Sequence, residues 1–420
     1  MGFDLLHPSE QIAATLLRIY AGGMTTTSGG NLSIRDESGD TWITPKGIDK
    51  GALSARDIVR IAADGKVEGL HPPSSEHPFH KAIYARRPDL AAIIHGHPPA
   101  LVAFSVVRQT PATEIIPQAQ RVCGRVGYAP YRVPGSEALG ESIAGAFEDR
   151  CDAVIMENHG TVVAGTSLSA AFQRFETLEF CARTLIRTRH IGRVQALSAA
   201  EIARFEHQDN LLPELASVVH PADERALRSE IVKFVHRATA QGLMISTYGT
   251  VSARWRGDDF LITPTGIDRR ELRPGDVVQI RDGSREPGKL PSRSVRLHRS
   301  IYQSHPHVQS IILTQSPNAM AFAVSGQRFD TRTIPESYLL LKDVPLVPYG
   351  EQFAGGRGVV RRLSPGTPIL LLQNDCILVT GRSVLGAFDR LEVAEFSARS
   401  IIDASALGEI VPMDAQAVAD

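Results

Sequence analysis

The sequence predicts an α/β fold that is present twice, each copy having a mixed, largely antiparallel sheet between helices. Three observations predict it. The 420 residues exceed one ordinary core and indicate about two domains. A series of segments recurs once, in the same order. Within a copy, helical patterns alternate with short strand pairs joined by tight turns, which favours a layered α/β domain.

The repeat is carried by three pairs of segments about 218 residues apart. WITPKGIDKGAL (42–53) returns as LITPTGIDRREL (261–272), HKAIYARRPDLAAII (80–94) as HRSIYQSHPHVQSII (298–312), and AFQRFETLEFCARTLI (171–186) as AFDRLEVAEFSARSII (387–402). Two copies are too few for a solenoid. We therefore predict a first domain over 1–200, a polar linker around 195–219 and a second domain over 220–420.

Caps, turns and hydrophobic patterns predict the elements of the first copy. Helices are predicted over 8–20 with Ser9 as N-cap, over 75–87 where Pro88 stops the helix, over 99–107, and from Leu168 onward. Strands are predicted over 31–35, 41–44, 90–97, 154–157 and 161–164.

Composition excludes several classes of function. The formal net charge is −1, so the overall charge supports neither nucleic-acid nor membrane-surface binding. There is no GxGxxG motif or P-loop, and no run of about 18 apolar residues. The start, MGFDLLHPSEQ, lacks a signal-peptide pattern, and the four cysteines form no CxxC pair, so we expect a reduced, cytoplasmic location.

Three histidines are candidate metal ligands. In His95-Gly96-His97, alternation along a strand places both imidazoles on one face. His159, in a turn before Gly160, is a third candidate, and three histidines with an open position are typical of a catalytic zinc site. Each motif also has a structural explanation: HxH is weak by itself, and His159 alone could be a turn residue.

A second group of residues could bind an anion. Ser74 and Ser75 precede a predicted helix whose free N–H groups suit a phosphate, and Gly30-Asn31 forms another backbone-rich turn. Glu76 follows them and is a candidate general base near a metal. The alternatives are an N-cap, a tight turn and a helix-dipole partner.

The two copies differ at these candidate positions together. Six residues of the first copy are replaced in the second: Asn31 by Thr250, Ser75 by Arg293, Glu76 by Ser294, His95 by Leu313, His97 by Gln315 and His159 by Asp375. Framework residues such as Ile43-Thr44-Pro45, Gly47 and Tyr84 have identical partners. His80 is retained as His298, which favours a structural role for it. We therefore expect the second copy to have lost its chemistry.

The motifs TTSGGNLSIR, ITPKG, PSSE, HGH and ENHG resemble, in order and spacing, those of the class II aldolase/adducin family, over both halves of the chain. Ser-Ser-Glu is most similar to the L-fuculose-phosphate aldolases, whereas the related epimerases usually carry Asp at the Glu position. The resemblance implies a three-layer α/β/α sandwich. It also implies a tetrameric ring with sites at subunit interfaces, so that a dimer of this chain would form a pseudo-tetramer.

Residue by residue, the resemblance implies roles for nine positions. It implies a metal site of His95, His97 and His159 for zinc or manganese, Glu76 as catalytic acid/base, and a substrate-phosphate region of Gly30, Asn31, Gly47, Ser74 and Ser75. Lys46 stands in this region where the family often has Thr, and we expect its positive charge to contribute to phosphate binding. The expected reaction is carbon–carbon cleavage of a phosphorylated ketose or sugar acid through a metal-stabilised enediolate.

One departure from the family pattern leaves alternatives open. Aldolases of this type use a tyrosine as proton donor where this chain has Gln118, and an amide is no acid. Decarboxylation or epimerisation on the same scaffold therefore remains open, as does a non-catalytic, adducin-like binding module. No nucleic-acid or membrane partner is predicted.

Overall fold

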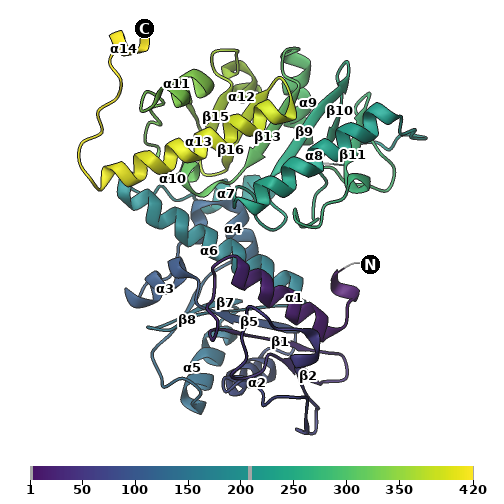
Figure 1. Cartoon of the computed structure of the whole chain (residues 1–420), viewed down its shortest axis with the longest axis vertical. Coiled ribbons are helices and arrows are strands. Elements are labelled where there is room, and N and C mark those ends of the chain that lie inside the picture. The colour runs from purple at the N-terminus through teal and green to yellow at the C-terminus, as the bar shows by residue number, and fades with distance from the viewer. Residues whose placement is uncertain (1–2, 207–210, 420) are drawn as a thin grey trace. The chain divides into compact units, whose positions relative to one another are not determined.

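The structure is a computed structural model that describes residues 3–206 and 211–419. It contains two compact units (Figure 1). The described residues of the first unit are 3–113 and 118–183, and those of the second are 114–117, 184–206 and 211–419. Within the predicted linker, residues 207–210 lie outside the described residues, and an unpredicted helix, α7 (Ala199–Glu206), precedes them.

The first unit contains one sheet of eight strands. In spatial order these are β4 (Val67–Glu68), β3 (Val59–Ile61), β2 (Thr41–Ile43), β1 (Asn31–Arg35), β5 (Ala92–Gly96), β8 (Gly160–Gly165), β7 (Ala153–Met156) and β6 (Gly127–Ala129). Every neighbouring pair is antiparallel except β6 and β7.

The second unit repeats this sheet strand for strand. Its order is β12 (Ser284–Arg285), β11 (Val278–Arg281), β10 (Asp259–Ile262), β9 (Thr250–Arg256), β13 (Ser310–Thr314), β16 (Cys376–Gly381), β15 (Ile369–Leu372) and β14 (Leu346–Val347). Again only the last pair is parallel. The predicted fold, a mixed and largely antiparallel sheet between helices that is present twice, is confirmed.

Helices cover both faces of each sheet (Figure 1). In the first unit, α2 (His77–Arg86) and α5 (Glu137–Glu148) lie on one face and α1 (Pro8–Ala21) and α6 (Leu168–Ile191) on the other. The shorter helices α3 (Pro99–Val106) and α4 (Pro117–Cys123) lie in the connection from β5 to β6. The second unit has α9 (Val295–Ser304) and α12 (Arg357–Arg362) opposite α8 (Ala222–Ala240) and α13 (Val384–Ser405), with α10 (Pro317–Ser325), α11 (Pro335–Leu341) and α14 (Ala415–Ala419).

Apolar side chains between the layers form the cores. In the first unit, Phe79 and Ile83 of α2 and Phe147 of α5 pack against Val154 and Val162 of the sheet, and none is more than 2% exposed. Removing each such side chain from water stabilises the fold by about 1.5–3 kcal/mol.

Element boundaries differ from the predictions by a few residues. Helix α1 begins at Pro8, and its N-cap is His7, whose ring accepts the Ser9 N–H, so Ser9 is not the cap. Helix α2 begins at His77 rather than Ser75, which places Glu76 at the N-cap position. The strand predicted over 90–97 is limited to Ala92–Gly96.

The duplication extends to polar contacts inside the units. Glu179 accepts hydrogen bonds from the N–H groups of Ala100 and Leu101 at the start of α3, and burial raises the pKa of its carboxyl to about 7. Glu395 accepts from Asn318 and Ala319 at the start of α10 in the same way. These carboxylates satisfy N–H groups that a helix start leaves unpaired, so their roles are structural.

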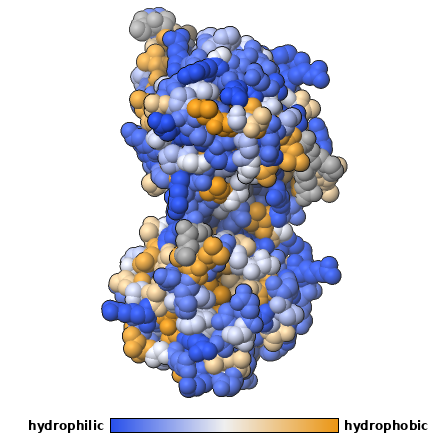
Figure 2. All heavy atoms as spheres, turned by 90° about the vertical axis from the view of Figure 1, so that its right-hand side faces the viewer, coloured by the Kyte–Doolittle hydropathy of each residue, from blue (hydrophilic) through white to orange (hydrophobic). Residues whose placement is uncertain are grey.

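No helix among the described residues combines the length and apolarity that crossing a membrane requires. On the face shown in Figure 2, hydrophobic residues form separate patches among hydrophilic ones.

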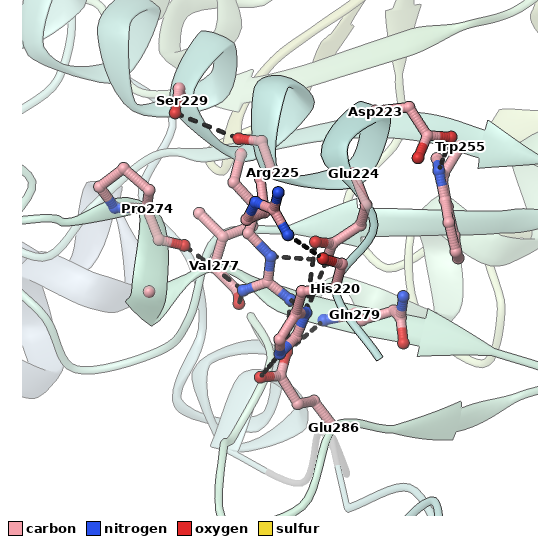
Figure 3. Close-up of polar contacts among 12 residues, drawn as sticks. His220, Asp223, Glu224, Arg225, Ser229, Trp255, Pro274, Val277, Gln279 and Glu286 are labelled. Carbon is pink, nitrogen blue, oxygen red and sulfur yellow. Dashed lines mark hydrogen bonds and ion pairs between the residues drawn. The ribbon is translucent and has the colours of Figure 1, made fainter. Parts of the chain in front are cut away.

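Charged side chains form a network in the second unit. Arg228 of α8, 4% exposed, donates to Glu224 at 2.5 Å and to Glu286, next to β12, at 2.7 Å (Figure 3). His220 lies 3.2 Å from Glu224, and Lys289 lies 2.5 Å from Glu286. The network ties α8 to the edge of the sheet.

Replacing Arg228 tests this anchor. Because Glu224 is fully buried, Arg228→Ala leaves its charge without the guanidinium, and we expect the free energy of unfolding to fall by about 3–5 kcal/mol. Chemical denaturation measures this. Arg399→Ala is the control, since Arg399 and its partner Asp403 are 62% and 58% exposed, and we expect it to cost less than about 1 kcal/mol. Equal losses in the two variants would contradict the assignment.

Candidate active site

Strand β5, in the middle of the first sheet, positions the candidate site. It carries His95, which lies opposite Asn31 of β1 on one side and Val162 of β8 on the other. His97 follows two residues later, just beyond the end of β5. His159 lies in the turn between β7 and β8, next to Asn158, whose φ of 52° closes the turn. Because β5 and β8 are neighbours in the sheet, the segment after β5 and the turn before β8 lie at the same end of it. The three histidines therefore lie together at that end.

The three imidazoles face one another. One possible ligand atom from each of His95, His97 and His159 lies within 4.8 Å of the others, and among the described residues this is the group that could hold a metal ion. The ring centroid of His95 is 4.7 Å from that of His97 and 4.9 Å from that of His159. Three nitrogen donors at such distances match an open, three-histidine metal site.

Hydrogen bonding fixes the tautomer of His95. Its Nδ1–H donates to the carbonyl oxygen of Thr161 at 2.9 Å, so Nε2 carries the lone pair. Nε2 is buried and accepts no hydrogen bond in the described structure. A buried nitrogen of this kind, oriented by a carbonyl group behind it, fits a metal ligand.

The environment keeps the triad neutral. Burial, and then the neighbouring rings of His97 and His159, hold the pKa of His95 well below 6.5. Burial likewise lowers the pKa of His97 and of His159, against the opposing effect of the Glu76 carboxylate. Neutral imidazoles are the form that binds metal ions.

Glycines allow the backbone to approach the triad. A Cβ atom on Gly29 would lie 2.8 Å from His97 Nδ1, and one on Gly160 would lie 2.7 Å from His97 Cδ2. Gly96 is constrained from behind, because its Cβ would lie 2.8 Å from the ring of Phe175 on α6. The opposite face of the HxH motif is therefore packed against a helix.

Glu76 places its carboxylate at the triad from the start of α2. Its Oε2 lies 3.3 Å from His95 Nε2, and its Oε1 lies 3.5 Å from His159 Nε2. Asn31 donates its amide N–H to Oε2 at 2.6 Å. Glu76 is thus held beside the histidines by a side chain from the adjacent strand.

The loops expected to bind a phosphate lie together. The bridge between Pro45 and Pro73 and the bond from Lys46 N–H to Pro72 O join the ITPKG and PSSE segments. Lys46, Gly47 and Ser75 are exposed, and Ser74 is half-buried. Gly30 has a φ of 75°, and its Cβ would lie 2.8 Å from the His95 carbonyl oxygen. Asn31, in contrast, is 3% exposed and bonded to Glu76. Gln118 lies in the first turn of α4.

Sequence reasoning missed Lys50, which supports these loops. The side chain is 3% exposed, donates to the carbonyl oxygen of Pro45 at 2.7 Å, and has a pKa lowered by burial. In the second unit Arg269 takes this place and donates to Pro264 and Gly249 carbonyl groups. The signal available in the sequence was that both copies carry a positively charged residue at this position.

The corresponding region of the second unit is built differently. Leu313 stands where His95 stands, and Gln315 donates its amide N–H to the Asp375 carbonyl oxygen at 2.9 Å. Gln352 donates to the Asp375 carboxylate at 3.0 Å. The side chains of Gln315 and Asp375, which stand in place of two of the histidines, are therefore each hydrogen-bonded within the second unit.

The chain is similar to known sugar-phosphate enzymes. It is 33% identical over 198 residues to 5-deoxy-D-ribulose 1-phosphate aldolase of Bacillus thuringiensis (46% of this chain, 91% of that protein). It is 34% identical over 187 residues to 3-oxo-tetronate 4-phosphate decarboxylase of Pectobacterium atrosepticum (44% and 85%). It is 34% identical over 197 residues to L-fuculose phosphate aldolase of Escherichia coli (46% and 90%).

The sequence profile of one family matches both halves of the chain. The profile, described as the class II aldolase and adducin N-terminal domain, matches residues 10–186 and again 229–402, which is most of the chain. The relatives align with less than half of this chain while contributing nearly their whole length, as a duplicated domain requires. The chain belongs to the class II aldolase and adducin family and carries the family domain twice.

Proposed function

We propose that the first unit is a metal-dependent lyase that cleaves a carbon–carbon bond beside the carbonyl group of a phosphorylated ketose or sugar acid. One observation carries the proposal: three neutral histidines face one another, and a carboxylate lies 3.3–3.5 Å from two of them. His95 Nε2 is buried, has no hydrogen-bond partner and faces the other two histidines, which fits a metal ligand.

In this proposal, His95, His97 and His159 hold a divalent ion, zinc or manganese. Such an ion supplies positive charge that polarises the substrate carbonyl and stabilises the enediolate left by bond cleavage. Glu76 moves the proton, because its carboxylate lies beside the histidines and is held there by Asn31.

The substrate phosphate is assigned to the joined loops. Backbone N–H groups at Gly30 and Gly47, the hydroxyl groups of Ser74 and Ser75, and the exposed Lys46 ammonium suit a phosphate. The Asn31 amide contributes from the adjacent strand. The names of all three relatives given above include a phosphorylated compound, which supports a phosphorylated substrate.

Decarboxylation is the second candidate. Loss of CO₂ from a 2-hydroxy-3-oxo acid leaves the same kind of enediolate as aldol cleavage, but no proton has to be taken from a hydroxyl group that becomes the carbonyl of a departing aldehyde. Gln118 at the position of the family tyrosine favours this outcome, and the 34% identity to a decarboxylase is compatible with it. Assaying one purified sample for both aldehyde and CO₂ release separates the two, whereas an epimerase releases neither.

The second unit has a non-catalytic role in this proposal, like an adducin-type binding module. We propose that two chains assemble so that four family domains form a pseudo-tetramer, which sedimentation tests. All four cysteines are buried and none forms a disulfide bond, which fits a reducing, cytoplasmic compartment.

Metal content tests the triad. We expect the purified chain to bind about one divalent ion and His159→Ala to bind almost none, because two ligands hold an ion much less tightly than three. Elemental analysis after zinc loading and desalting measures this. His71→Ala, which removes a histidine paired with Asp57 outside the triad, is the control and should keep its ion. Equal metal content in both variants would refute the site.

The pH dependence of metal affinity follows from the lowered pKa values. Protons compete with the metal only when the imidazoles are protonated, and the pKa of each triad histidine lies below 6.5. We therefore expect zinc affinity, measured by chelator competition, to stay nearly constant from about pH 8 to about pH 6.5 and to fall only at lower pH. A steep fall between pH 7.5 and 6.5 would contradict the burial argument.

Glu76→Gln separates catalysis from metal binding. The amide keeps the shape of the side chain but cannot take up a proton, so we expect kcat to fall about 10²–10⁴-fold while metal content stays the same. Glu68→Gln, at a partly exposed carboxylate paired with Arg60 and Lys66, is the control. Full lyase activity in the Glu76 variant would exclude it as the acid/base.

A further inference from the structure

A chain of hydrogen bonds runs from Glu76 into the core of the first unit. The Glu76 carboxylate accepts from Asn31 Nδ2 at 2.6 Å, and Asn31 Oδ1 lies 2.5 Å from His80 Nε2. His80 Nδ1 lies 2.7 Å from Ser33 Oγ, which lies 2.8 Å from the Tyr84 hydroxyl. Asn31, Ser33, His80 and Tyr84 are each at most 4% exposed, so the inner end is shielded from bulk water.

The carboxylate dictates the direction of each bond. An ionised carboxylate only accepts, so the Asn31 amide must turn its N–H groups toward Glu76 and its oxygen toward His80. That oxygen also only accepts, so His80 must carry its proton on Nε2. Burial holds the pKa of His80 well below 6.5, so the ring is neutral and Nδ1 accepts from Ser33.

The second unit provides a natural comparison. His298 repeats the inner half of this series of hydrogen bonds. Its Nδ1 lies 2.7 Å from Ser252 Oγ, which in turn lies 2.7 Å from the Tyr302 hydroxyl. Thr250 stands in place of Asn31 and bonds instead to Ser292 at 2.7 Å. His298 Nε2 is buried and has no hydrogen-bond partner in the described structure. The contact of Nδ1 with a serine therefore occurs in both copies, whereas the contact of Nε2 occurs in the copy that has the carboxylate.

We propose that His80 is a positioning residue for Glu76, acting through Asn31. The Nε2–H of His80 holds the Asn31 amide in the one orientation that points an N–H at the carboxylate. Without this donor the amide can rotate and present its oxygen to Glu76, which repels the carboxylate and displaces it from the histidines. The proposal rests on the proposed role of Glu76 as the acid/base, and it adds a function to a residue whose retention in both copies indicates only a structural one.

Two substitutions at His80 separate its two nitrogens. Glutamine can place an amide nitrogen near the Nε2 position, whereas asparagine keeps a polar atom near Nδ1 and nothing near Nε2. In the zinc-loaded full chain, we expect His80→Asn to lower kcat about 10–100-fold, the typical cost of losing such a supporting contact, with KM changed less than about threefold. We expect His80→Gln to retain kcat to within about threefold of the original value, because it keeps the donor to Asn31.

His298→Asn is the matched control. It removes the same ring from the same Ser–Tyr contact in the second unit, so it should cost similar stability, measured by chemical denaturation, and leave kcat and metal content unchanged. Unchanged kcat in His80→Asn would overturn the proposal. So would equal losses of kcat in His80→Asn and His80→Gln, because the effect would then not depend on the Nε2 donor.

A spectroscopic readout tests the same idea without activity. In the chain labelled with ¹⁵N-histidine, long-range ¹H–¹⁵N spectra distinguish the two neutral tautomers, and His80→Gln identifies the His80 signals. We expect a protonated Nε2 and an unprotonated Nδ1 at His80. A protonated Nδ1 would overturn the proposal even if the chain is an active lyase. If the protein is inactive but shows the expected tautomer, the proposed reaction is refuted, whereas the series of hydrogen bonds from Glu76 to His80 remains supported.

Discussion

The pairing of β5 with β1 on one side and β8 on the other is the constraint on which the candidate site depends. It sets His95 directly opposite Asn31, and it brings the turn before β8, with His159, to the end of the strand where His97 emerges. A shift by one residue would turn His95 toward the helix on the other face. The second unit keeps the same register, with Leu313 opposite Thr250 and Leu378. The framework therefore does not depend on the ligands that it carries in the first unit.

Most of the long elements of the first unit could be predicted from the sequence, whereas three of its short strands could not. Helix α6 and the hairpin of β7 and β8 have clear patterns, whereas β3, β4 and β6 are two or three residues long and are strands only because a neighbour pairs with them. A pattern of period two needs more residues than these strands contain. Helix α5 was missed although Ser136, whose hydroxyl accepts the Leu139 N–H, is a recognisable N-cap.

The three histidines and Glu76 could be singled out as candidates from the sequence because the two copies differ at those positions, but their contacts could not be predicted. Nothing in the order of residues connects Asn31 to Glu76 or Phe175 to Gly96, since these contacts join elements far apart in the chain. Retention of a residue in both copies does not show what each of its atoms contacts. His80 has a structural contact on one ring nitrogen and a different contact on the other.

The cost of buried polar groups accounts for the residues that the second unit has at the corresponding positions. A buried nitrogen such as His95 Nε2 forgoes its hydrogen bond with water, which a protein tolerates when a ligand repays the loss. In the second unit Leu313 carries no such nitrogen, and the side-chain amide of Gln315 donates to the backbone carbonyl oxygen of Asp375. His298 Nε2 is the exception, because its ring is still needed by Ser252 and Tyr302. Its unsatisfied nitrogen is what remains of the contact that the first unit uses.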